Sequence, residues 1–239
     1  MGGFFNMDGA FFKFGNILAD IMILSLVWIV FSIPLFTIGA STTALFYVTT
    51  RRISDREGYV MKDFISSFKS NFKQSTKIWL LWCVLYGIVI SNIYMLANFD
   101  FDPRLHAVLL PVQVIILIEL FITSIYLFPI TARFEMSFRQ TIKTSFFMAN
   151  KHLLTTVTAI ATAVAIVLSA AMFFEPILLV GMGLYAYATS HTIMGVFKKY
   201  RPEMDEDHFS QELAPMPDIE EADPLELEDS SEDSSKTQF

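Results

Sequence analysis

Five long apolar runs constrain this chain more than any other feature of its sequence. They cover residues 17–38, 78–96, 107–130, 153–174 and 176–196. The hydrocarbon core of a bilayer is about 30 Å thick, which a helix of roughly 20 apolar residues can cross. Backbone amides in that core must pair within their own segment, and the runs lack the period-two alternation of barrel strands. The pattern therefore predicts an all-α membrane protein with five transmembrane helices.

A soluble protein with five buried helices is the alternative interpretation of the same runs. Apolar residues make up 54% of the 239 residues and are concentrated in these runs. A soluble chain of this size cannot hide five such helices from water. We therefore expect the lipid bilayer to be the main partner of the chain.

The basic residues are divided unequally between the two sides of the predicted helices. One side carries Lys13 and Arg104 only. The other side comprises the connections before the second and fourth runs and the segment after the fifth, and it carries fourteen basic residues. Because basic connections stay in the cytoplasm, we expect the N-terminus outside and the C-terminus inside. The fourteen are Arg51, Arg52, Arg56, Lys62, Lys69, Lys73, Lys77, Arg133, Arg139, Lys143, Lys151, Lys198, Lys199 and Arg201.

The charge changes sign near residue 201, which divides the chain into two parts. Residues 1–201 form the predicted five-helix transmembrane domain. Residues 202–239 contain fourteen acids, four prolines and one basic residue, Lys236. Such a composition cannot bury enough apolar surface to fold, so we expect a disordered acidic tail in the cytoplasm. The basic residues lie at membrane edges rather than along one face, so nucleic acid is not an expected partner.

The basic connection before the second run contains an aromatic stripe. Phe64, Phe68 and Phe72 are spaced four residues apart, and Lys69 and Lys73 lie beside them. This spacing predicts a short amphipathic helix at the inner membrane interface. A lipid anchor and a docking surface for an inner partner are both consistent with it.

A similar but looser stripe occurs in the connection before the fourth run. It consists of Phe138, Ile142 and Phe146, and Pro34 and Pro129 also lie at similar places in the first and third runs. The pattern favours two related membrane hairpins followed by a fifth helix.

Glu119 lies in the middle of the third apolar run. A carboxylate at that depth costs a few kcal/mol, so it must face other helices, be paired or be protonated. It lies about 18 Å from the outer end of its run, and His191 lies about 22 Å from the outer end of the fifth, so the two could meet. Two interpretations of Glu119 remain: a proton or substrate site, and a structural hydrogen bond between helices. Asn92 is expected to form an interhelical hydrogen bond, and Asp20 to reach headgroup water.

No sequence motif indicates catalysis. The chain has no Gly-rich phosphate loop, no H-E-x-x-H, no G-x-S-x-G and no repeated metal-ligand spacing. Its one cysteine, Cys83, cannot form an internal disulfide. We therefore expect no enzymatic activity, no cofactor and no metal site.

Three stretches carry a resemblance to a known family: Phe4–Gly9, Gly15–Asp20 and Gly39–Leu45. Together with Phe64–Lys73 they resemble the YesL-like family of bacterial membrane proteins of unknown function, over the chain to about Arg201. The resemblance implies the cell membrane of a Gram-positive bacterium. It also implies a neighbourhood with carbohydrate ABC importers and glycan-degrading enzymes, and it assigns no catalytic residue.

Two functional hypotheses follow from these observations. In the first, the chain is an accessory component of carbohydrate uptake that binds the permease subunits of an ABC importer. In the second, it is a small secondary transporter or channel that uses Glu119.

Overall fold

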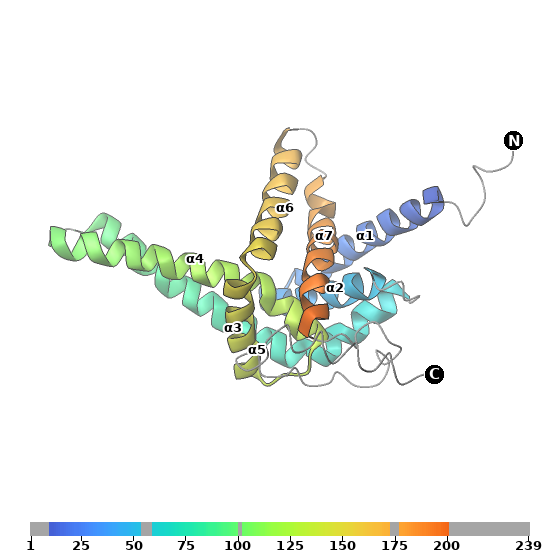
Figure 1. Cartoon of the computed structure of the whole chain (residues 1–239), viewed down its shortest axis with the longest axis horizontal. Coiled ribbons are helices and arrows are strands. Elements are labelled where there is room, and N and C mark those ends of the chain that lie inside the picture. The colour runs from blue at the N-terminus through green and yellow to red at the C-terminus, as the bar shows by residue number, and fades with distance from the viewer. Residues whose placement is uncertain (1–9, 54–58, 100–101, 173–176, 201–239) are drawn as a thin grey trace, which may run out of the picture.

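The computed structural model describes residues 10–53, 59–99, 102–172 and 177–200 (Figure 1). These residues form helices and no strands, which confirms the all-α prediction. The α-helices are α1 (Ala10–Ser32), α2 (Ile38–Ile53), α3 (Val60–Asn98), α4 (Pro103–Arg133), α5 (Phe138–Lys151), α6 (Leu153–Met172) and α7 (Ile177–Tyr200), and a 3-10 turn, η1 (Leu35–Thr37), precedes α2. The predicted acidic tail, 202–239, lies outside the described residues.

Four of the described helices are long and apolar enough to cross a membrane. They are α1 from Gly15 to Ser32, α3, α4 and α6. The fifth predicted span corresponds to α7, which is not among the four, so the count of five and the orientation stay predictions. The chain is thus an integral membrane protein with several candidate spans.

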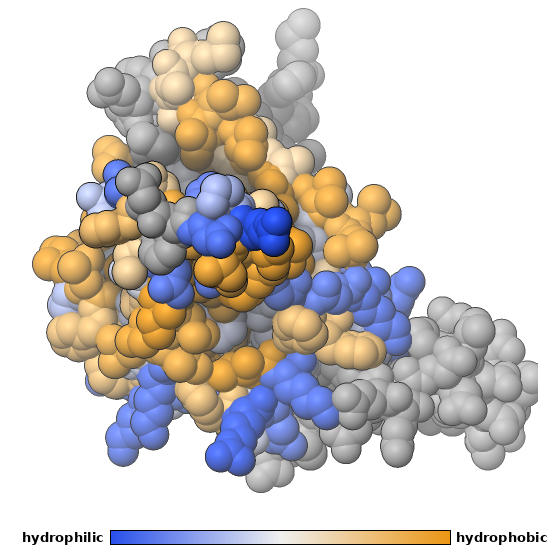
Figure 2. Space-filling view, turned by 90° about the vertical axis from the view of Figure 1, so that its left-hand side faces the viewer, coloured by the Kyte–Doolittle hydropathy of each residue, from blue (hydrophilic) through white to orange (hydrophobic). Residues whose placement is uncertain are grey.

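Three arms diverge from a common base. The α3–α4 hairpin, the α6–α7 hairpin and α1 extend in different directions, while α2 and α5 lie at the base (Figure 1). Large apolar side chains such as Val84, Ile115 and Val157 are exposed on these arms. Figure 2 shows a largely apolar surface, with hydrophilic side chains along its lower edge and in a patch near its centre. Exposed apolar arms of this kind require hydrocarbon as their surroundings.

The first apolar run ends earlier than predicted. It was expected to be helical to residue 38, but α1 ends at Ser32. Proline has no amide hydrogen and disfavours helical geometry in the residue before it, so Pro34 ends the helix. The hydroxyl of Thr37 donates to the carbonyl oxygens of Phe31 and Pro34, both at 2.6 Å, and satisfies the helix end.

Residues 39–53 are a buried helix, although the sequence indicated a connecting segment there. Helix α2 packs against α3, α7, α4 and α1, and most of its side chains are buried. A Cβ on Gly39 would lie 2.6 Å from Trp79 Cβ and 2.7 Å from the Ser75 carbonyl oxygen, so only glycine allows this approach to α3. Hydroxyl groups join the helices: Thr43 to Ser75 at 2.9 Å and Thr49 to Ser190 at 3.0 Å. Small and hydroxylated side chains thus place α2 at the centre of the base.

The predicted short amphipathic helix at 64–73 is not a separate element. It forms the first part of α3, one continuous helix of 39 residues and a length of about 58 Å. Phe64 is fully buried, and its ring lies 5.4 Å from that of Phe31 in α1. Phe68 lies 4.9 Å from the same ring. The aromatic stripe therefore packs within the protein, and Phe64 cannot belong to an exposed docking surface.

Candidate functional site

Glu119 is held by the end of α5. Its Oε1 accepts a hydrogen bond from Asn150 Nδ2 at 2.7 Å and another from Thr123 Oγ1 at 3.3 Å. Asn150 Nδ2 also donates to the Phe146 carbonyl oxygen at 3.0 Å, so both neighbours of the amide nitrogen are acceptors. The mid-helix carboxylate is therefore paired by hydrogen bonds, one of the arrangements expected from its depth.

Glu119 and His191, which the sequence allowed to meet, have other neighbours in the structure. His191 is exposed on α7, and its ring packs against Tyr187 with 5.0 Å between the centroids. Asn92 is half-buried on α3 and lies about 9 Å from the C-terminal end of that helix, whereas Glu119 lies about 24 Å from the start of α4. The three intramembrane candidates therefore do not form one site.

The sequence analysis missed an ion pair between α1 and α2. Arg52 Nε donates to Asp20 Oδ2 at 2.6 Å, and the two side chains are 31% and 15% exposed. Asp20 was expected to reach headgroup water, but α2 runs back along α1 and brings Arg52 to it. Arg51 pairs with Asp63 of α3 at 3.1 Å. Hydropathy identifies apolar membrane-spanning segments, but it does not show that the next helix packs antiparallel against one of them. The sequence therefore gave no indication of these ion pairs.

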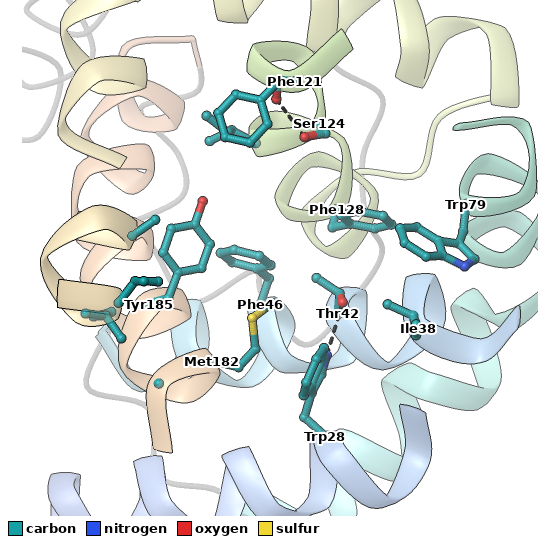
Figure 3. A pocket seen from close by; sticks show the side chains of 15 residues that line it. Trp28, Ile38, Thr42, Phe46, Trp79, Phe121, Ser124, Phe128, Met182 and Tyr185 are labelled. Atoms are coloured by element: carbon teal, nitrogen blue, oxygen red, sulfur yellow. Dashed lines mark hydrogen bonds between the residues drawn. The ribbon is translucent and has the colours of Figure 1, made fainter. Parts of the chain in front are cut away.

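An apolar cavity lies where the three arms meet. Its volume is about 480 Å³, within the range of ligand pockets. Side chains from α1, α2, α3, α4, α6 and α7 converge on it (Figure 3). The lining residues are Trp28, Ile38, Thr42, Phe46, Trp79, Phe121, Ser124, Ile125, Phe128, Ala163, Ile166, Val167, Gly181, Met182 and Tyr185.

The polar groups of the lining are largely occupied by other protein atoms. Trp28 Nε1 donates to Thr42 Oγ1 at 3.1 Å, as Figure 3 shows. Ser124 Oγ donates to the Phe121 carbonyl oxygen at 2.6 Å, and Trp79 Nε1 donates to the Leu35 carbonyl oxygen at 2.8 Å. A strongly polar ligand would leave hydrogen bonds unmade here, so the cavity favours an apolar occupant.

The rim of the cavity lies on the exposed apolar surface of α4 and α6. Phe121 of α4 and Val167 of α6 both line it and are 48% and 58% exposed. The two helices diverge from this point (Figure 1). Glu119 is not among the residues that line the cavity. It precedes Phe121 by two residues, and because each residue of an α-helix turns by about 100°, the two side chains lie on nearly opposite faces of α4.

A second polar cluster joins the α5–α6 junction to the end of α7. His152 lies within hydrogen-bonding distance of the Tyr200 hydroxyl, 3.0 Å from Nε2. Burial lowers the pKa of His152, and the positive charges of Lys151 and Lys199 lower it further. Lys151 Nζ lies 5.4 Å from the centre of the Tyr200 ring. This cluster ties the C-terminal end of α7 to the α5–α6 junction.

The described residues offer no other obvious chemistry. Within the ranges that the structure covers, no three His, Cys, Asp or Glu side chains come together as a metal site would require. Cys83 is exposed on α3.

Comparison with known proteins adds one match. A protein family described as "Protein of unknown function, DUF624" matches residues 21–93. No curated protein and no solved structure matches the chain. The matched segment comprises most of α1, all of α2 and most of α3, so it includes the α1 to α3 side of the cavity and excludes Glu119. Over this segment the chain is similar to a family whose function is unknown.

Proposed function

We propose that this integral membrane protein is an accessory component that binds a transmembrane helix of a partner between α4 and α6. The observation that carries the proposal is the apolar cavity that opens between these two helices toward the hydrocarbon. A helix placed there would insert one large side chain into the cavity and cover the exposed faces of both arms.

The cavity supports a protein partner better than a transported sugar. Its lining is dominated by aromatic and aliphatic side chains, and Thr42 and Ser124 are already engaged in hydrogen bonds. The hydroxyl groups of a sugar would lose their water without gaining partners. An accessory role beside a separate permease agrees with this polarity.

The identity of the partner comes from the family resemblance. That resemblance implies a neighbourhood with carbohydrate ABC importers, so we propose the permease subunits of such an importer as the partner. Docking of an inner partner through Phe64–Lys73 has less support, because Phe64 is buried and Phe68 packs on Phe31. The alternative of a small transporter that uses Glu119 gains no support from the cavity, which Glu119 does not line.

Photocrosslinking from the rim tests the proposal. A benzoylphenylalanine at Phe121 or Val167 should crosslink to a permease subunit identified by mass spectrometry. The same probe at Leu26, an apolar position on α1 that is 54% exposed, should give no such product. Crosslinks to lipid alone would refute partner binding and assign the cavity to an apolar lipid chain.

A matched pair of substitutions then tests the cavity itself. Ala163 lines the cavity, whereas Ala165 is exposed on the same helix two residues away. Ala163→Phe should fill the cavity and abolish co-purification of the permease in mild detergent. Ala165→Phe should leave it unchanged, and equal binding by both variants would contradict the proposal.

A further inference from the structure

We propose that the acidic segment after α7, which begins at Glu203, binds the lysine-rich base of the same chain. The inference is independent of the cavity and of the partner proposed for it. It assigns an occupant to a basic surface that the fold leaves uncovered among the described residues.

The first part of the basic surface is a row of lysines on α3. Lys69, Lys73 and Lys77 are exposed. They face outward because Phe64 and Phe68 occupy the opposite side of the helix, against Phe31. The two ion pairs found among the described residues use Arg51 and Arg52, and these three lysines pair with none of the described acids.

The second part lies where α7 ends. Lys151 and Lys199 are exposed there, near the buried Tyr200. Tyr200 is fixed by His152 at 3.0 Å, so the point at which the acidic segment leaves the fold is defined. Burial lowers the pKa of His152, and the positive charges of Lys151 and Lys199 lower it further, so both lysines lie near this point.

The acidic segment has the charge to cover this surface and starts beside it. Gln74 of α3, next to Lys73, donates to Thr141 of α5, and α5 leads from there over about 15 Å to Lys151 beside Tyr200. It carries fourteen acids against one lysine, and Glu203, Asp205, Glu206 and Asp207 are its first four. They follow Tyr200 by three to seven residues, so a chain of about 3.5 Å per residue extends at most roughly 10–25 Å from it. Linkage to the same chain raises the local concentration of these carboxylates near the lysines.

The consequence is an electrostatic cover on the inner face. Bound acids would compete with anionic headgroups, which attract lysines near a membrane surface. The cover would weaken with ionic strength, because the screening length falls from about 30 Å at 0.01 M salt to about 3 Å at 1 M.

Distance measurements on the full-length protein test the proposal. In a Cys83→Ser background, spin labels at Ser66→Cys on α3 and Ser210→Cys in the acidic segment report the separation by pulsed electron resonance. We expect a short distance population in low salt that decreases several-fold in 0.5 M NaCl. Replacing Glu203, Asp205, Glu206 and Asp207 by their amides should remove it, as should Lys69→Glu with Lys73→Glu.

A matched control keeps the total charge change equal. Amide replacement of Glu226, Glu228, Asp229 and Glu232 removes the same number of charges farther from α7, and the short population should persist. A distribution that is indifferent to salt and to all these substitutions would overturn the proposal. A short-distance population that disappears on dilution with unlabelled protein would also overturn it, because the acids would then come from a second copy. A short-distance population that appears only in vesicles of anionic lipid would overturn it as well.

Discussion

The helix pairs α1–α2 and α4–α5 have the same arrangement but bond their acidic side chains to different groups. In each pair, an apolar helix is followed by a second helix that runs back along it. An acid in the first helix meets a side chain at the end of the second: Asp20 meets Arg52 and Glu119 meets Asn150. The partners are 32 residues apart in the first pair and 31 in the second. A returning helix is thus a way to bring a donor to an acid in an apolar helix.

The two pairs differ in how they treat the charge. Arg52 brings an opposite charge to Asp20, whereas Asn150 offers Glu119 only hydrogen-bond donors. The returning helices differ as well, because α2 is buried on most of its surface and α5 is exposed on one side. The first pair is therefore the more deeply buried part of the base, and the acid of the second pair has a hydrogen-bonding amide in place of a counter-charge.

The closest packing in the first pair should give the largest effect. Gly39→Leu places a side chain against Trp79 and the Ser75 backbone, so α2 must move away from α3. We expect a loss of about 3 kcal/mol or more in the free energy of unfolding, measured by thermal unfolding in detergent. Gly87→Leu is the control, because a Cβ there meets nothing within 4 Å. Equal melting temperatures for the two variants would contradict the packing.

The charged pair should matter more than the amide pair. Arg52→Ala leaves Asp20 without its counter-charge, and we expect a cost of about 2 kcal/mol, reduced from that of a fully buried pair by the partial exposure of both side chains. Asn150→Ala should cost about 1 kcal/mol, the scale of one interhelical hydrogen bond. A larger loss for Asn150→Ala would reverse the comparison. A double-mutant cycle with Asp20→Asn isolates the coupling of the ion pair.

Substitutions of Glu119 separate a structural from a transporting role. Glu119→Gln keeps the size and an oxygen acceptor for Asn150, so stability should change by no more than about 1 kcal/mol. Glu119→Ala should cost more, because Asn150 loses its acceptor and a gap opens. If the protein serves carbohydrate uptake as proposed above, growth on the sugar concerned should be normal for Glu119→Gln when Glu119 is structural. Stable protein with lost growth would support proton coupling instead.

The smallest expected effect is the pH dependence from His152. Its pKa is lowered in the folded protein, so both states hold the neutral ring above the unfolded value of about 6.5. As the pH falls through that value, the unfolded chain takes up the proton first, and stability decreases until the folded pKa is passed. His152→Gln should lose less stability between pH 8 and pH 5.5 than the unchanged protein. An identical decrease in both would contradict the assignment.

The candidate sites show where sequence reasoning stopped. The depth of Glu119 indicated that it must be paired or otherwise compensated, and in the structure Asn150 bonds to it. His191, a possible partner from the sequence, lies exposed on another helix. The stripe of Phe64, Phe68 and Phe72 correctly indicated a helical face. Whether that face meets lipid, a partner or Phe31 depends on how α1 lies against α3, which local spacing does not encode.

The sequence by itself determined the α-helical class and the positions of four apolar helices. Length and hydropathy are local properties, and a bilayer leaves a chain with such runs little choice but to form helices. Only the tertiary structure decided that residues 38–53 form the centre of the base. Their glycine, serine and threonine side chains have ordinary hydropathy, and they become buried because they allow helices to approach closely, which depends on the surfaces of α3, α4 and α7. The cavity was decided in the same way, since it is the space left where six separate helices converge.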